Sequence, residues 1–198
     1  MILDDLVVPG TAASAAALEV ASAYESPALL NHSLRAYAWA AAHGTMSGIG
    51  FDPELLYVAA LFHDIGLVPA FDSYTVPFEE AGGHVARVFA AGAGWQAGRR
   101  ERLAEVIIRH MWRRVDVSAD PEGYLLARAT QTEITGTNLD DFPPGFRAAV
   151  LERHPRLDIT GEFLACLEAQ AERKPGSAAG ASVRSGLGTR MAGNPLDS

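Results

Sequence analysis

The stretch Leu61-Phe62-His63-Asp64-Ile65-Gly66 places an imidazole and a carboxylate side by side at the end of an apolar run that begins at Leu55. An unbroken apolar run before two polar groups indicates that these groups are carried into the protein interior. A buried carboxylate is costly unless it is paired or holds a metal ion, and the adjacent imidazole favours a metal. A His-Asp dipeptide alone is often only a structural pair, so the interpretation depends on what else converges on it.

The length and composition of the chain indicate one ordinary globular domain. The chain has 198 residues, of which 48% are hydrophobic, and this is enough for a single full core. The formal net charge is -8, so the basic surface typical of proteins that bind nucleic acid or anionic membranes is missing. We therefore expect neither of these partners.

The cysteine content and the first residues favour the cytoplasm. Cys166 is the only cysteine, which excludes an intrachain disulfide and fits a reducing compartment. Residues 1–5 carry two acids where a signal peptide needs basic residues. No stretch approaches the roughly 20 apolar residues of a membrane helix. These features predict a cytoplasmic protein without a membrane span.

Helix-start signals recur along the chain, and no segment shows the alternation of a strand. Ser26-Pro27, Asp52-Pro53 and Asp120-Pro121 each pair an N-cap residue with a proline suited to the first helical position. Apolar residues then follow at three- and four-residue steps. These signals predict helices over residues 12–23, 28–46, 53–64, 78–91, 99–112, 121–132, 144–154 and 160–173. The predicted fold class is all-α.

The sequence contains six histidines, and four are expected to face inward: His32, His63, His84 and His110. His32 and His110 lie among apolar residues of predicted helices, and His84 follows Gly82-Gly83, where missing side chains open room. His43 and His154 are expected at a helix end or on the surface. For His32 taken alone, a core histidine bonded to a carbonyl is the competing interpretation.

The inward histidines and Asp64 come from separate predicted helices, apart from the adjacent pair. Helical bundles build metal sites in this way, from inward side chains of facing helices. Neutral imidazole and carboxylate suit zinc, iron, manganese or nickel rather than calcium. The sequence therefore predicts a site for a divalent metal ion at the centre of the bundle, with zinc as the first choice.

Two short strings carry a resemblance to a known family. Asn31-His32-Ser33-Leu34-Arg35 and the segment 60–66 resemble the His and His-Asp motifs of the HD-domain metal-dependent hydrolase superfamily. Members of this superfamily are all-α proteins whose signature ends in a distal Asp. Phe78-Glu79 and Arg153-His154-Pro155-Arg156 are nearest to the cyanamide hydratase-like branch. The resemblance covers about residues 25–175.

The resemblance and the composition together predict the organisation of the chain. Residues 25–174 are expected to form an HD-type helical bundle, preceded by a partly helical N-terminal segment, 1–24. After Lys174-Pro175 the sequence becomes rich in Gly, Ala and Ser, which predicts a flexible C-terminal tail over 175–198. The apolar segment 12–18 suits packing on its own core or on a second chain, which leaves a homo-oligomer open.

One position departs from the family pattern. The stretch 129–136 corresponds to the family's distal Asp region, and it places Glu133 at the position of that ligand. The resemblance thus implies a ligand set of His32, His63, Asp64 and Glu133. Glutamate has the same donor atoms on a longer arm, so it could ligate directly, ligate through a water or act as a base. Asp140 and Asp141 are nearby substitutes.

A mononuclear site would leave an open position for water. A bound cation lowers the pKa of a coordinated water from about 15.7 toward about 7. The cyanamide hydratase-like branch implies a small nitrile-type substrate, to which water is added. In this interpretation Asp64, His84 and His110 are the catalytic candidates, with His84 or His110 moving a proton or binding the substrate. Phe62, Phe78, Trp112 and Phe142 are candidate walls, although each is individually more typical of a core aromatic.

Two other interpretations remain open. If His84 and His110 are also ligands, a second ion lies beside the first, as in HD phosphodiesterases and di-iron oxygenases. Phosphoester hydrolysis would require cations near the site, for which the sequence offers Arg35, Arg109, Arg113 and Arg114. Alternatively, the change to Glu133 marks a non-catalytic module that binds a ligand or a partner.

Overall fold

A computed structural model describes residues 2–197 as an all-α protein, and no strand occurs in this range. This confirms the predicted fold class. Short 3-10 turns lie at Leu3–Asp5, Ile65–Leu67, Leu139–Asp141 and Pro195–Asp197. The helices are α1 (Ala12–Tyr24), α2 (Pro27–Met46), α3 (Pro53–Phe62), α4 (Phe78–Gly92), α5 (Ala97–Arg109), α6 (Pro121–Thr135), α7 (Pro144–Arg153), α8 (Ile159–Arg173), α9 (Ala178–Arg184) and α10 (Leu187–Ala192).

The helix starts follow from local chemistry. The side chains of Ser26, Asp52 and Asp120 each accept a hydrogen bond from the backbone N–H three residues further on, and each is followed by a proline. The capping oxygen satisfies a donor that the helix itself leaves free. These contacts fix where α2, α3 and α6 begin, as the sequence predicted.

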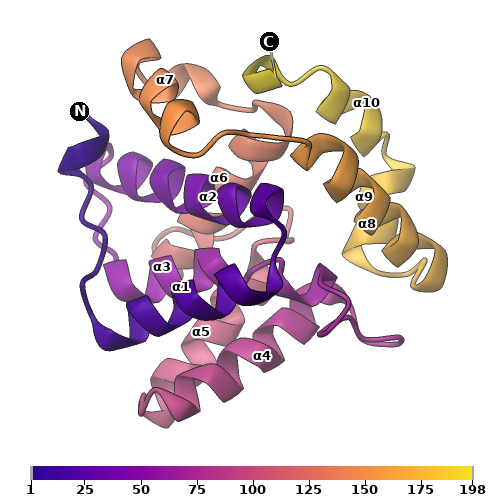
Figure 1. The fold of residues 1–198 in the computed structure, drawn as a ribbon, viewed down its shortest axis with the longest axis horizontal. Helices are drawn as coiled ribbons and strands as arrows, with labels where there is room; N and C mark the ends of the chain where they lie inside the picture. The colour runs from indigo at the N-terminus through magenta and orange to yellow at the C-terminus, as the bar shows by residue number, and fades with distance from the viewer. Residues whose placement is uncertain (1, 198) are drawn as a thin grey trace.

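The centre of the molecule is formed by α2 and α3. Residues 55–62 of α3 are all buried, and α2 packs against α3 and α6. The pair α4 and α5 lies at one end of the molecule, and α8 to α10 lie along one side (Figure 1). Because α3 ends in this core, its C-terminal end carries His63 and Asp64 into the interior.

Two glycines let α4 approach the His63-Asp64 turn closely. A Cβ atom added at Gly66 would lie 2.1 Å from the carbonyl oxygen of Phe78, at the start of α4. A Cβ atom added at Gly82 would lie 3.0 Å from the carbonyl oxygen of Phe62. The first contact is shorter than a side chain tolerates and the second is tight, so glycine at these positions allows the close spacing between α4 and the end of α3.

The C-terminal region differs from the expected flexible tail. Residues 178–197 form α9, α10 and a final 3-10 turn, and they bury Leu187, Met191 and Leu196 against the core. The side chain of Ser177 caps α9 by accepting from the N–H of Gly180. The high content of small residues allows these short helices to pack closely rather than leaving the segment without structure.

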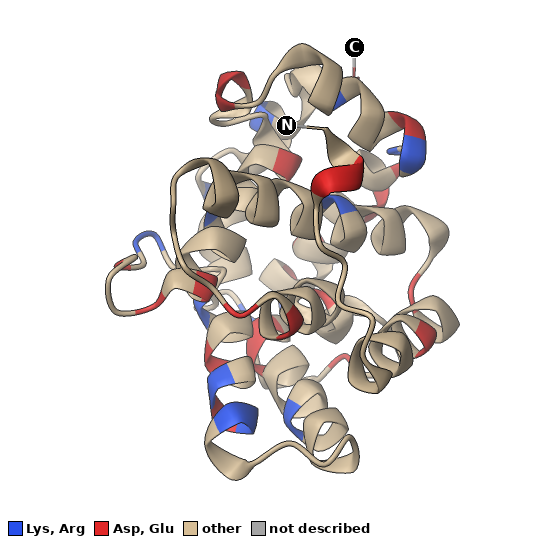
Figure 2. Ribbon diagram, turned by 90° about the vertical axis from the view of Figure 1, so that its left-hand side faces the viewer, with Lys and Arg blue, Asp and Glu red and all other residues tan. Residues whose placement is uncertain are grey.

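Charged residues of both signs are spread over the chain. Acidic and basic residues are interspersed along the helices (Figure 2), and the chain has a formal net charge of -8. Among residues 2–197, no helix is long and apolar enough to cross a membrane.

Candidate metal centre

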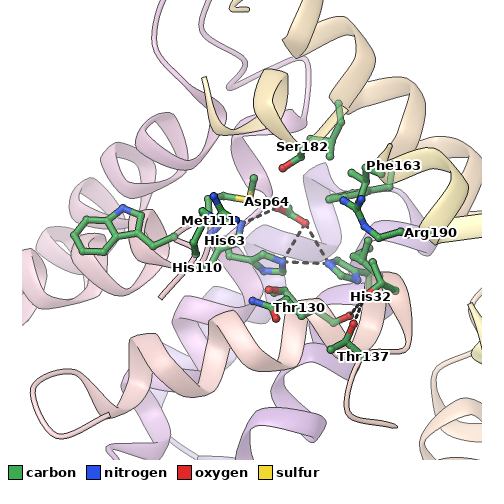
Figure 3. A pocket seen from close by; sticks show the side chains of 17 residues that line it. His32, His63, Asp64, His110, Met111, Thr130, Thr137, Phe163, Ser182 and Arg190 are labelled. Atoms are coloured by element: carbon green, nitrogen blue, oxygen red, sulfur yellow. Dashed lines mark hydrogen bonds and ion pairs between the residues drawn. The ribbon is translucent and has the colours of Figure 1, made fainter. Parts of the chain in front are cut away.

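Three donor atoms from two helices meet at the centre of the bundle. The Nε2 atom of His32, on α2, lies 3.1 Å from Nε2 of His63, at the end of α3. The Oδ2 atom of Asp64 lies 3.2 Å from the first nitrogen and 3.0 Å from the second. All three side chains are buried. Figure 3 shows them pointing toward one another.

The hydrogen bond of Nδ1 in His63 shows which of its two ring nitrogens carries the proton. Nδ1 of His63 lies 2.7 Å from the carbonyl oxygen of Ala60. A carbonyl can only accept, so Nδ1 carries the proton and Nε2 presents a lone pair to the centre. A backbone carbonyl that orients an imidazole from behind is a common arrangement in metal sites.

The arrangement around Asp64 fits a divalent cation. Both carboxylate oxygens are buried and have no hydrogen-bond partner among the described residues, which is costly for an ionised group. A tetrahedral ion with bonds of about 2.0–2.1 Å to nitrogen or oxygen separates its ligand atoms by roughly 3.3 Å. The observed separations of 3.0–3.2 Å lie close to this value. We conclude that His32, His63 and Asp64 can hold one ion.

His110 lies next to this triangle, at the C-terminal end of α5. Its Nδ1 donates to the carbonyl of Ile107, and its Nε2 lies 3.6 Å from Oδ1 of Asp64. Burial and the neighbouring His63 lower the pKa of His110 to about 4. At neutral pH its imidazole is therefore uncharged, with a bare Nε2 facing the centre.

Glu133, the predicted fourth ligand, is occupied by other partners. Its Oε1 accepts from Arg35 and Arg156, and its Oε2 accepts from Trp39. Burial alone would raise the pKa of Glu133, but Arg35 and the hydrogen bonds of the carboxylate lower it to about 2. The structure therefore places Glu133 behind the cluster, with Oε1 3.6 Å from Nδ1 of His32, and corrects the expectation that it is a direct ligand.

His84 is not brought to the cluster. It lies on α4 with an exposed side chain, whereas the preceding glycines face inward. Gly82 lies against the end of α3, and Gly83 lies against Ile108 and Ala104 of α5. The glycines thus make room for the neighbouring helices and turn His84 outward, which corrects the expectation that it is catalytic or binds a second ion.

The cluster forms the floor of a cavity of about 330 Å³. Of the aromatic walls predicted from the sequence, Trp112 lines this cavity, whereas Phe62, Phe78 and Phe142 are buried in the core. The opposite wall comes from the C-terminal helices and includes Phe163, Ser182, Leu187 and Arg190 (Figure 3). Sequence reasoning missed Ser182, Leu187 and Arg190 because it assigned the region after residue 174 to a tail.

Comparison with known proteins gives one family. The model of the HD domain family matches residues 29–129, about half of the chain. This range includes His32, His63, Asp64 and His110 and ends before Glu133. Among curated proteins, none matches the chain.

Proposed function

Because the chain belongs to the HD domain family, whose members are in general metal-dependent hydrolases, we propose that it is a mononuclear metal-dependent enzyme that adds water to a small molecule. The finer proposal is a nitrile-type substrate of the cyanamide kind. The observation that carries the proposal is the triangle of buried donors, His32, His63 and Asp64, on the floor of a cavity sized for a small molecule.

The donor set determines which metals suit the centre. Two imidazole nitrogens and one carboxylate oxygen fit zinc best, and iron, manganese and nickel accept the same donors. A bound divalent ion would lower the pKa of a coordinated water toward about 7 and polarise an electrophile beside it. The protein residues supply the remaining functions, which are positioning and proton transfer.

His110 is the residue placed to move a proton. Its uncharged imidazole presents a bare Nε2 on the cavity floor, where it can accept a proton from water and return it to the substrate. In nitrile hydration the hydroxyl group is added to carbon and the proton to nitrogen, so one group can serve both transfers. Asp64 takes part as a ligand whose second oxygen faces His110.

The geometry favours one ion over two. A second ion would need His84 or Glu133, but His84 is exposed and Glu133 is occupied by arginines and Trp39. Asp140 and Asp141 are exposed and pair with Arg147 and Arg128, so His110 would be the remaining extra ligand among the predicted residues. The mononuclear interpretation therefore needs fewer rearrangements than a di-iron oxygenase or a two-metal phosphodiesterase.

A second candidate, phosphoester hydrolysis, is favoured by the arginines at the cavity. Arg35 is bonded to Glu133 and Arg109 to Asp120, so neither is free for a substrate. Arg113 lines the metal-site cavity and an adjacent one, which Arg114 and Arg128 also line. An anionic substrate would be attracted to this side.

A test of function combines metal analysis with two substrate panels. We expect about one ion per chain, conversion of cyanamide or a small nitrile to its hydrated product, and loss of both ion and activity in His63→Ala with helical content unchanged. His84→Ala is the matched histidine control and should behave as the wild type. If the wild type instead releases phosphate from phosphoesters, and Arg113→Ala releases it more slowly, the function is phosphoester hydrolysis. If the wild-type protein purifies without metal, and the His63→Ala variant folds equally well, the protein is a binding module. This outcome would overturn both enzyme proposals.

A further inference from the structure

A second cavity of about 340 Å³ lies on the other side of Phe163 from the metal centre. Phe163 lines both cavities, and its ring lies 5.7 Å from that of His32. The other walls come from the α1–α2 corner, from residues 67–69 and from α8. None of the residues of the metal triangle lines it, so it is a separate cavity.

The charged groups of this second cavity are both acidic. Glu25 lies at the α1–α2 corner and is only 7% exposed, and its Oε1 is buried with no hydrogen-bond partner among the described residues. Its Oε2 accepts from Ser33 at 3.4 Å. Glu162 lies on the facing helix α8 and accepts from the hydroxyl of Ser26 at 2.7 Å. No basic residue lines the cavity.

The surroundings leave Glu25 short of positive charge. Burial and the negative charge of Asp64 raise the pKa of Glu25 well above its ordinary value. A cation placed in the cavity would pair with the free oxygen and offset both effects. The apolar part of the walls, which includes Leu29 and the rings of Tyr24 and Phe163, suits carbon atoms attached to that cation.

We propose that the second cavity binds a small organic cation of the alkylammonium type, with its charge between Glu25 and Glu162 and its alkyl group against Leu29 and Phe163. A bare metal ion would leave the apolar walls without a partner. A neutral molecule would leave the charge of the buried Glu25 carboxylate uncompensated.

Calorimetric titration of the full-length protein with propylammonium chloride tests this site, with 1-propanol as the uncharged probe and sodium chloride at matched ionic strength. We expect propylammonium to bind with a dissociation constant on the order of 1 mM and propanol to show no saturable binding. Glu25→Gln should weaken the affinity about tenfold or more, because a hydrogen bond to a charged group is lost.

Three further variants locate the site. Glu168→Gln, on an exposed position of α8, is the matched control and should leave the affinity unchanged. Cys166→Phe should abolish binding by filling the cavity, and Glu162→Gln provides a second charge removal should Glu25→Gln melt early. Equal binding of propanol, or full affinity in both glutamine variants, would overturn the proposal. Metal content measured on the same samples shows separately whether the metal centre is intact.

Discussion

Asp64 and Glu133 are both completely buried carboxylates near His32, yet their surroundings are opposite. Glu133 accepts hydrogen bonds from two arginines and a tryptophan. Within residues 2–197, neither oxygen of Asp64 has a hydrogen-bond partner, and ring nitrogens of His32 and His63 lie 3.0–3.2 Å away. The first carboxylate is neutralised by the protein itself, whereas the second is left to be neutralised by a cation.

The comparison separates two roles that look identical in the sequence. A buried carboxylate surrounded by N–H donors stabilises the fold, and its charge is already compensated without a metal ion. A buried carboxylate beside imidazole nitrogens has lost its hydration, and a divalent cation at the common point would satisfy all three groups. The following predictions test this distinction.

Asp64→Asn should have the largest effect, on metal content and activity. The substitution keeps the shape of the side chain but removes the charge that holds the ion. We expect loss of the metal and a fall in kcat/KM of about 10³-fold or more, since a catalytic cation supplies several kcal/mol. Elemental analysis measures the metal content, steady-state kinetics measures kcat/KM, and circular dichroism checks that the helices are intact. A variant that keeps its metal would contradict the assignment of Asp64 as a ligand.

Glu133→Gln should act mainly on stability. Removing one partner of a buried ion pair leaves Arg35 and Arg156 uncompensated, which costs about 3–5 kcal/mol of the free energy of unfolding. The folded fraction should still bind metal, because Glu133 is not a ligand. Urea denaturation and metal analysis of the folded protein give the two readings. Metal loss without a loss of stability would reverse the roles assigned to the two acids.

Acid should remove the contribution of Glu133 over a defined pH range. The carboxylate holds its charge more tightly in the folded state, with a pKa lowered from 4.5 to about 2. Its stabilisation is therefore present above pH 4.5 and lost as the pH falls toward 2, about 3 kcal/mol in total. Unfolding free energies measured by urea between these pH values should fall more steeply for the wild type than for Glu133→Gln. If the unfolding free energies of the wild type and the variant fall in parallel with pH, the neighbours of Glu133 do not stabilise its charged form.

Asn194→Ala tests whether the C-terminal helices are part of the fold. The side-chain amide of Asn194 donates to the carbonyl oxygen of Glu133 at 2.9 Å, and Asn194 is buried. Loss of this bond leaves a buried acceptor with Arg156 as its remaining partner, so we expect a cost of about 1–3 kcal/mol. Thermal melting measures it. An unchanged melting temperature would restore the original expectation of a loose tail.

His84→Ala should have the smallest effect. The side chain is exposed on α4, and substitutions at such positions usually change stability by about 0.5 kcal/mol or less. Metal content and activity should equal those of the wild type. Loss of an ion in this variant would instead indicate a binuclear centre.

The helices up to residue 173 could be predicted because they depend on local rules, whereas the meeting of His32 with His63 and Asp64 was predicted from inward-facing side chains and two family motifs. N-cap residues fix where helices begin, and the apolar run fixes the burial of the dipeptide. The partners of Glu133 are not local, since Arg35 lies 98 residues before it. One signal was available: His32, Arg35 and Trp39 are spaced to share one face of a helix, so an acid was needed opposite the arginine.

The orientation of His84 and the structure of the C-terminal region were not predicted for different reasons. At His84 the glycines were read as room for the histidine, whereas they make room for helices. Near the C-terminus, composition outweighed a weak pattern, namely Ser177 as an N-cap and the apolar residues Leu187 and Met191 one helical turn apart. Membership of the HD domain family was recognised from two short motifs, and the cyanamide hydratase-like branch stays a proposal.

The metal donors and two of the residues that bond to Glu133 lie far apart along the polypeptide, with a consequence for biosynthesis. His32, His63 and Asp64 leave the ribosome early, while Arg156 and Asn194, which bond to Glu133, emerge late. Domains generally fold as units during or after synthesis. We therefore expect metal loading to await the emergence of Arg156 and Asn194, and nascent chains that lack these residues to carry no tightly held ion.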